Sequence, residues 1–448
     1  MALADVGAGE QSDVGTGSVF DAGLAPDAGL APDATPDAGL TPDAATPKSC
    51  ESVSTPQGRY VCEHDLVLDT LDFSAPTDDL ASLATYLGNR TIVMLGEGDH
   101  GAAELISGRL RLAGYLYQHG FTVLASESGH ASERKLQKYL DSGDSTVLNQ
   151  IVNNNSGTFF GVTQTIDFYR GLRKLTVDRP QGRPPFQVVG FDLEHDRPPA
   201  RDFVLAYVAA AASEGLATQM GPLVKCIGLT VACETKQGQA LELFEGAAQQ
   251  LVSSSSQAAY DEALWVLKGL AASVHFYRKF AEGQYDGEYR EAFMAARANA
   301  LISSNPQGVI FQGHTGHLSK VRDEWTSYQT VGESITTTFG SDRVYCIVLL
   351  GNHGAHLVST NSGFEVMDLD SAPSGYMEWF LEDAGDPMLF LDLGSAVEGA
   401  EGSDWLFQSI YADWMWAGWA GYNERFVPRD NWDAVLYISQ VTPTTPVH

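Results

Sequence analysis

The stretch Thr91-Ile-Val-Met-Leu-Gly-Glu-Gly-Asp-His100 decides the fold of this chain. A short run of β-branched and aliphatic residues ends in a glycine-rich turn with three titratable side chains, and apolar residues then recur at helical spacing over residues 102–118. The pattern predicts a strand, a loop and a helix in that order. This unit is the repeating element of parallel sheets that carry helices on their faces.

The same pattern recurs along the chain. Strands are predicted at residues 91–95, 121–125, 186–190, 309–312, 344–350, 388–391 and 434–438. Each of the first four ends in a cluster of Glu, Asp or His, which is where open parallel sheets place their ligands. We therefore predict an α/β fold with a mostly parallel central sheet, flanking helices and a functional site at its carboxyl edge.

Residues 199–305 interrupt this alternation. The segment is rich in Ala, Leu, Glu and Gln, has few strand signals, and is too long for an ordinary crossover. We expect a large helical subdomain inserted over the carboxyl edge of the sheet, where it covers a pocket. Residues 50–448 then form one α/β domain that contains this lid.

Residues 1–49 differ from the rest in composition. They repeat Asp-Ala-Gly-Leu-Ala-Pro units with too little apolar surface to offset chain entropy, which predicts a disordered acidic linker. The segment resembles linkers that follow the signal or lipoprotein anchor of exported Gram-negative bacterial proteins. Residues 1–9 lack the basic and then apolar segments of a signal peptide. If a leader was removed ahead of the linker, we expect a periplasmic, secreted or surface-tethered bacterial protein; the alternative is that the segment is an expression scar.

The charge balance excludes one class of partner. Among 448 residues there are 27 Lys and Arg against 57 Asp and Glu, a formal net charge of −30. Nucleic-acid binding is not expected, because it requires clustered cations to neutralise phosphates. No apolar run reaches the ~20 residues of a transmembrane helix.

The five cysteines suggest an oxidising compartment. Cys50 and Cys62 flank a turn region, and Cys226 and Cys233 bracket a short segment, so two local disulfides are predicted. Cys346 lies in an apolar strand and is expected to be a buried free thiol.

The polar clusters at the strand ends supply the candidate site. Glu97, His100 and Glu104 would share one face if their turn is helical. Glu127 leaves the second strand, and His314 and His317 leave the fourth. We expect these groups to converge on one edge of the sheet.

Several of these segments resemble the erythromycin esterase family. The matching stretches are Leu95-Gly-Glu-Gly-Asp-His-Gly-Ala-Ala-Glu104, Phe121-Thr-Val-Leu-Ala-Ser-Glu127, Gly190-Phe-Asp192, Tyr289-Arg-Glu-Ala-Phe-Met-Ala295, Phe311-Gln-Gly-His-Thr-Gly-His317 and the closing segment 432–443. They follow the family order over about residues 60–445. The resemblance implies an ester or lactone hydrolase that activates water directly, without a covalent acyl-enzyme.

The resemblance also implies roles for individual residues. His100 would be the general base, with Glu97 or Glu127 orienting it and holding the water. Arg290 would stabilise the oxyanion, and His314 and His317 would orient the substrate or protonate the leaving alkoxide. The chain has no Gly-x-Ser-x-Gly nucleophile elbow, in agreement with this mechanism.

Departures from the family pattern fall in the expected lining of the site. Gly98-Asp99 replaces Ala-Thr, Thr315 replaces Asn, and Gly313 replaces Ala. These changes keep the titratable groups but leave the substrate open, macrolide or other natural product. Residues expected to contact substrate or support the site are Glu104, Asp99, Asp192 and Thr315.

Other functions use the same residues. Glu97, His100, Glu127, His314 and His317 could hold zinc or manganese in a metal-dependent hydrolase or peptidase, although the primary expectation is a site without a cofactor. Some family relatives are associated with succinoglycan biosynthesis, which keeps a polysaccharide-tailoring enzyme open. A non-catalytic extracytoplasmic ligand-binding protein is the remaining alternative, and the sequence leaves the oligomeric state undetermined.

Removing residues 1–49 should change the melting temperature by no more than a few degrees, because a linker of this composition buries almost no apolar surface. Differential scanning calorimetry of the full-length and truncated chains measures the change. A larger fall in melting temperature would show that the segment packs on the domain.

Overall fold

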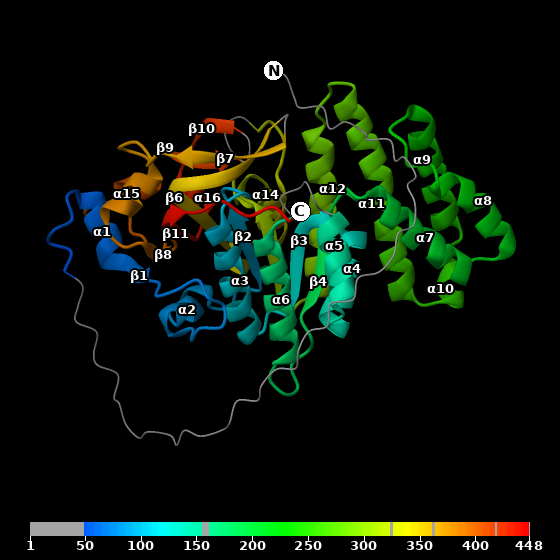
Figure 1. The fold of residues 1–448 in the computed structure, drawn as a ribbon, viewed down its shortest axis with the longest axis horizontal. Helices are drawn as coiled ribbons and strands as arrows, with labels where there is room; N and C mark the ends of the chain where they lie inside the picture. The colour runs from blue at the N-terminus through cyan, green and yellow to red at the C-terminus, as the bar shows by residue number, and fades with distance from the viewer. Residues whose placement is uncertain (1–48, 155–160, 323–325, 361–362, 417–418, 448) are drawn as a thin grey trace, which may run out of the picture.

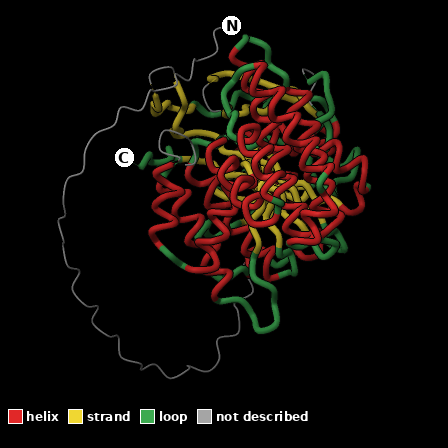
Figure 2. Tube along the Cα trace, turned by 90° about the vertical axis from the view of Figure 1, so that its right-hand side faces the viewer, coloured by secondary structure: helices red, strands yellow, loops and turns green. Residues whose placement is uncertain are grey.

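A computed structural model describes residues 49–154, 161–322, 326–360, 363–416 and 419–447. Apart from its last residue, the linker predicted at residues 1–49 lies outside the described residues. The described chain forms a layered α/β structure in which helices surround most of the central sheet, while β7 (Gly363–Leu369), β9 (Ile410–Trp416) and β10 (Trp419–Phe426) lie at one edge of the molecule (Figures 1 and 2).

The strands form one large sheet and one hairpin. They are β1 (Asp65–Val67), β2 (Ile92–Glu97), β3 (Val123–Gly129), β4 (Gln187–Asp192), β5 (Val309–His314), β6 (Val344–Thr360), β7 (Gly363–Leu369), β8 (Met388–Asp392), β9 (Ile410–Trp416), β10 (Trp419–Phe426) and β11 (Ala434–Val441). Within the described residues the large sheet has the order β1-β8-β11-β6-β2-β5-β3-β4, with β7 paired to β6 and β9 paired to β10. The six strands from β11 to β4 run parallel, and β1, β7 and β8 join antiparallel.

All seven predicted strands are present, and the mostly parallel sheet is confirmed. Every residue of β2 is buried, as expected for a strand covered on both faces. The strand lies where the order switches direction, because β3, β4 and β5 lie on one side of it and β6 and β11 on the other. The carboxyl end of such a strand opens into the crevice where α/β sheets bind ligands.

The helices are α1 (Pro56–His64), α2 (Leu83–Leu87), α3 (Ala103–Gln118), α4 (His130–Ser142), α5 (Ser145–Asn154), α6 (Thr163–Val177), α7 (Arg197–Ala211), α8 (Glu214–Val224), α9 (Val231–Gly246), α10 (Ala248–Ser254), α11 (Gln257–Ala281), α12 (Gly287–Ser304), α13 (Thr315–Leu318), α14 (Val331–Phe339), α15 (Met377–Asp383) and α16 (Pro428–Asn431). Two apolar cores enclose the sheet. One joins it to α3 and α6, and the other joins it to α12, α14 and α15. None of the described helices is long and apolar enough to cross a membrane.

Residues 199–305, the range of the predicted helical subdomain, contain helices that divide into two parts. Helices α7 to α11 share an apolar core of their own beyond the β4 edge of the sheet (Figure 1). Helix α11 also reaches the carboxyl end of β4, where Glu194 N donates to Gly269 O at 3.3 Å. Helix α12, inside the predicted boundary of residues 199–305, packs on β4 and α14 as part of the sheet's own helical layer. The covering role of this subdomain stays a prediction.

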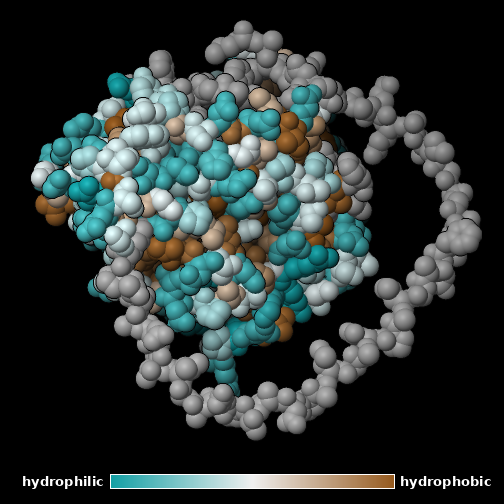
Figure 3. All heavy atoms as spheres, turned by 60° about the vertical axis from the view of Figure 1, so that its left-hand side comes forward, coloured by the Kyte–Doolittle hydropathy of each residue, from teal (hydrophilic) through white to brown (hydrophobic). Residues whose placement is uncertain are grey.

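The surface carries no concentration of large apolar side chains among the described residues. The most exposed ones, Val397, Val231, Val366, Tyr285 and Val177, lie on separate segments of the chain. Figure 3 shows hydrophilic residues over much of one face, with apolar residues interspersed. This distribution is normal for a water-exposed surface.

Both predicted disulfides are present. Cys50 is bonded to Cys62 and ties the start of the described chain to α1, and Cys226 is bonded to Cys233 at the start of α9. Cys346 is a free, buried thiol, as predicted. Disulfides of this kind persist in oxidising compartments.

Alkylation of the native protein, produced under oxidising conditions, should label no cysteine, and alkylation after denaturation should label Cys346 alone. The reason is that four thiols are paired and the fifth is enclosed. Mass spectrometry counts the labels, and five labels in the denatured wild type would contradict both bridges.

The bridge between Cys50 and Cys62 closes a short loop of the chain. Removing this bridge with a Cys50→Ser and Cys62→Ser double variant should lower the free energy of unfolding by about 3 kcal/mol, because the unfolded chain gains the entropy of a loop of this length.

Candidate active site

The candidate site lies where β2, β5, β3 and β4 end. Parallel pairing sets Glu97 of β2 beside His314 of β5 in the same register. Glu127 comes from β3 and Asp192 from the last position of β4, while Arg290 reaches them from the first turns of α12. The sheet therefore brings together side chains that are up to 220 positions apart in the sequence, such as Glu97 and His317.

His100 is held by a buried carboxylate. Its Nδ1 lies 2.7 Å from Glu97 Oε1, and the other oxygen of Glu97 lies 3.0 Å from Arg109 Nη2. Burial of His100 favours the neutral ring, but the hydrogen bond and charge of Glu97, with the charge of Glu127, raise its pKa above the usual range. With its proton on Nδ1, the neutral ring has Nε2 as its basic nitrogen.

A second group is built around Arg290. The Nη2 atom of Arg290 donates to Glu127 Oε1 at 2.9 Å, and its Nε donates to Asp192 Oδ1 at 3.1 Å. His317 Nε2 lies 3.2 Å from the same Glu127 oxygen, and His317 Nδ1 contacts Glu291 Oε1. Two basic side chains thus alternate with three carboxylates at the edge of the sheet. The order is Asp192, Arg290, Glu127, His317, Glu291.

The charges in this group reinforce one another. Burial opposes ionisation of Glu127, but His317, Arg290 and His100 lower its pKa well below the usual range. Burial likewise disfavours the charged form of His317, but Glu291 and Glu127 raise its pKa well above that of an ordinary histidine. We conclude that His317 is an imidazolium and Glu127 a carboxylate over the whole range near neutral pH.

His314 is a neutral imidazole near neutral pH. Its backbone N donates to Glu127 Oε2 at 2.7 Å, and its ring Nδ1 accepts from Gly316 N at 3.1 Å. Burial and the charge of His100 lower the pKa of His314 to about 3. Its ring lies between the other two, with centroids 5.5 Å from His100 and 6.3 Å from His317.

Gly313 makes room for this arrangement. A Cβ atom at position 313 would lie 2.7 Å from Glu127 Oε2 and 2.8 Å from Glu127 Cβ, closer than real Cβ contacts. A glycine at the position where the family pattern has Ala lets the Glu127 side chain lie against β5 and accept from His314 N.

Three residues of the predicted lining lie outside the group. Glu97, His100 and Glu104 would share a face only if their turn were helical, and it is not: Glu97 ends β2, while Glu104 is in the first turn of α3, where it accepts from Thr442 N at 2.7 Å. Asp99 is fully buried and pairs with His356 Nδ1 at 2.9 Å. Thr315 turns inward, within reach of Trp432 Nε1 at 3.3 Å.

Sequence reasoning missed three contributors. Arg109 follows His100 by nine residues and binds Glu97 from α3. Glu291 is adjacent to Arg290 in the quoted helix motif, so its position was a usable signal. His195 follows the Gly-Phe-Asp segment and binds Asp192.

The donors present do not form a metal site in this arrangement. Among the described residues, no three His, Cys, Asp or Glu side chains are grouped so that they could hold an ion. Both ring nitrogens of His317 contact carboxylates, and Nδ1 of His100 contacts Glu97. The metal-dependent alternative therefore needs a rearrangement of these contacts.

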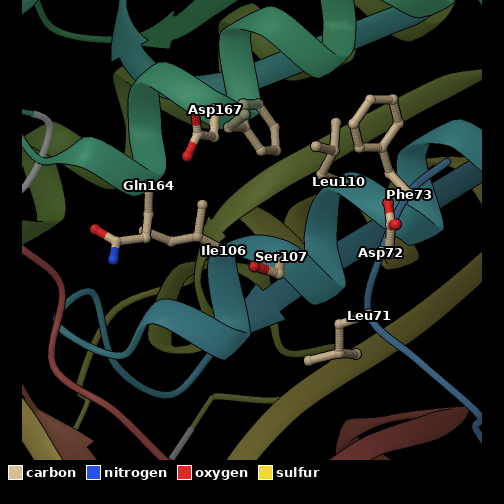
Figure 4. Close-up of a pocket in the computed structure, with 9 residues that line it drawn as sticks. Leu71, Asp72, Phe73, Ile106, Ser107, Leu110, Gln164 and Asp167 are labelled. Atoms are coloured by element: carbon tan, nitrogen blue, oxygen red, sulfur yellow. The ribbon is translucent and has the colours of Figure 1, made fainter.

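A hollow of about 210 Å³ lies outside the group of His100, Glu127 and Arg290, between α3, α6 and residues 71–73 (Figure 4). Its lining is mainly apolar, with Leu71, Phe73, Ile106 and Leu110 around it. It is linked to the site through one wall residue, Phe168, whose ring lies 5.8 Å from the Arg109 guanidinium carbon.

Comparison with known proteins identifies the family. The family model described as erythromycin esterase matches residues 116–441, and the chain belongs to the erythromycin esterase family. The match begins after the segment of Glu97 and His100. YbfO of Bacillus subtilis, which its name describes as a hydrolase, is 21% identical over 83% of this chain and 88% of its own length.

Solved structures show the same fold. A Bacillus cereus protein superimposes with a TM-score of 0.75 at 19% identity, over 90% of this chain and 100% of its own. A succinoglycan biosynthesis protein gives 0.69 at 15% identity over 87% and 98%, and the erythromycin esterase EreC, in an open conformation, gives 0.65 at 16% identity over 84% and 98%. The names of the family and of its relatives indicate a hydrolase.

Lowering the pH from 6.5 to 5 should destabilise the wild-type protein more than a His314→Gln variant, by about 2 kcal/mol. The sign follows from the depressed pKa of His314. Below pH 6.5 its unfolded form takes up a proton that the folded form refuses, so acid favours unfolding. Urea titrations at several pH values measure the difference, with His119→Gln, remote from the group, as the matched control. Parallel pH profiles for wild type and His314→Gln would contradict a buried neutral His314.

Proposed function

We propose that the protein hydrolyses a carboxylic ester or lactone by direct activation of water. One observation carries this proposal. A basic imidazole, His100, is fixed by a buried carboxylate on one side of the site, and a cationic group, Arg290 with His317, is fixed on the other side. A base and a preformed positive charge are the two requirements for attack of water on a carbonyl group.

In the first step, His100 Nε2 takes a proton from water while Nδ1–H donates to Glu97 Oε1. The oxygen of the water forms a bond to the carbonyl carbon, and the carbonyl oxygen becomes an alkoxide. Glu97 stabilises the imidazolium that forms, and Arg109 keeps Glu97 in place. The Arg290 Nε and Nη2 atoms bind carboxylates, and Nη1 lies 3.3 Å from His317 Nε2. We therefore propose that the alkoxide is stabilised by the combined positive charge of Arg290 Nη1 and His317.

In the second step, the tetrahedral intermediate collapses. The bond from the carbonyl carbon to the alkoxy oxygen breaks, and that oxygen takes the proton from the His100 imidazolium. A carboxylic acid and an alcohol leave, and His100 is again neutral. The cycle uses one water and requires neither a covalent enzyme intermediate nor a redox partner.

The contacts of the two serines beside Glu127 support a mechanism without a serine nucleophile. Ser126 Oγ accepts from Gln312 Nε2 at 2.9 Å, and Ser128 Oγ donates to Glu133 Oε1 at 2.5 Å. Neither contact is with a histidine, whereas a catalytic serine is activated by an adjacent base. We propose that both serines are structural.

The relatives' names define the substrates to test. An erythromycin esterase suggests a macrolide lactone, and a succinoglycan biosynthesis protein suggests an acylated polysaccharide. A panel of macrolides, simple lactones, aryl esters and acylated glycans separates these classes, and hydrolysis of none of them, with ligand retained unchanged, would favour the binding-protein alternative. We also propose an extracytoplasmic location, which the two disulfides support.

His100→Gln should reduce kcat by at least about 100-fold, because it removes the base and leaves the fold intact. Ser126→Ala and Ser128→Ala are the matched controls and should retain most activity, with no adduct after rapid quenching. The logarithm of kcat/KM should rise with pH and reach its plateau only at a pH above 6.5. The reason is that the neutral ring of His100 is the base and the pKa of this ring is raised.

Metal analysis and a chelator complete this test. Undiminished turnover in chelator is expected for the metal-free mechanism, and loss of turnover restored by zinc or manganese would replace it with the metal-dependent one. Near-normal turnover by a folded His100→Gln enzyme would refute the role of His100, whatever the metal result.

A further inference from the structure

We propose that His195 is a positioning residue for Arg290, and that Tyr277 of the helical subdomain holds His195 in place. The inference rests on the proposed function, because it gives Arg290 its role at the carbonyl oxygen. It adds a connection that runs from α11 through His195 and Asp192 to the cationic group.

Asp192 is the shared link in this connection. Its carboxylate accepts from Arg290 Nε at 3.1 Å, contacts Arg290 Nη2, and accepts from Leu193 N at 2.7 Å. His195 Nε2 lies 2.7 Å from Asp192 Oδ2, the oxygen that also contacts Nη2 of Arg290. The Asp192 side chain is completely buried, so the orientation of its two oxygens depends on these donors.

The protonation of His195 follows from its two neighbours. Asp192 accepts from His195, and burial of Asp192 is outweighed by Arg290 and His195, which lower its pKa. A carboxylate at this position requires the proton of the neutral ring on Nε2, so Nδ1 must accept. The Tyr277 hydroxyl contacts Nδ1 and is the donor there. A hydroxyl remains available for this, because burial raises the pKa of Tyr277 to about 12.

The connection crosses a boundary between two parts of the fold. Tyr277 belongs to α11, whose other residues pack mainly in the separate core of the helical subdomain, whereas Asp192 ends β4 of the sheet. The His195 side chain is 37% exposed, so it lies at the surface of the site rather than in a packed core. We infer that the hydrogen bonds of His195, rather than its packing, are what the site uses.

Three variants test the connection on a verified ester substrate. His195→Phe should lower kcat about tenfold with KM changed less than about twofold, because it removes a hydrogen bond to a charged group that acts in the transition state. The His195→Gln variant should keep kcat within about threefold of the wild type, since the amide of the new glutamine side chain can donate to Asp192. Tyr277→Phe should lower kcat about threefold in wild type but have no effect in the His195→Phe background, because Tyr277 acts through His195.

His119→Phe is the control, since it makes the same change at a residue that contacts the backbone O of Tyr115, away from the site. It should leave kcat unchanged. An unchanged kcat in His195→Phe, or a further loss on adding Tyr277→Phe to it, would overturn the proposal.

A measurement without turnover separates this proposal from the proposed function. In ¹⁵N-histidine spectra at neutral pH, His195 should show a protonated Nε2 and an accepting Nδ1, and the Nδ1 signal should move in Tyr277→Phe. A protonated Nδ1 in the neutral ring, or no response to Tyr277→Phe, would refute the connection. Absence of ester hydrolysis by the wild type, with the expected spectra, would instead refute the proposed function and leave the hydrogen-bond connection standing.

Discussion

Carboxylates enclose the guanidinium group of Arg290, and this contact constrains the rest of the site. A largely enclosed Arg290 is tolerated only with partners, since removing an ion from water costs several kcal/mol. Glu127 and Asp192 supply those partners from the ends of β3 and β4, which fixes the relation of α12 to both strands. Glu127 in turn accepts from the backbone of His314 and from His317, so β5 is tied to the same charge. The distance between the base and the cationic group therefore follows from the pairing of the strands.

The strand ends were predictable for a physical reason. Parallel strands covered on both faces are continuous apolar runs, and the first polar residue after each run must lie at the edge. That logic located Glu97, Glu127, Asp192 and His314 without any knowledge of the strand order. The helix motif placed Arg290 in the group, although only the family resemblance gave a reason to choose it. Hydrophobic periodicity could not have shown that β5 lies between β2 and β3, because strand order depends on packing far from each strand.

The sequence did not predict the hydrogen-bond and ion-pair partners of most side chains. Asp99 and Glu104 stand in the motif at plausible positions, yet one pairs with His356, 257 positions away, and the other with the backbone of Thr442. A spacing rule cannot anticipate such partners. The β9 and β10 hairpin was missed because its aromatic residues favoured a buried wall or core, and the β7 strand was missed because half of it is exposed.

The last strand has a consequence for how the protein is made. β11 (Ala434–Val441) is inserted between β8 and β6, inside the sheet rather than at its edge. Until those residues emerge from the ribosome, β6 and β8 each lack one neighbour and expose unpaired backbone on that side. The interior of the sheet is therefore completed only when nearly the whole chain has been made, and strand edges that wait for a partner are the ones prone to aggregation.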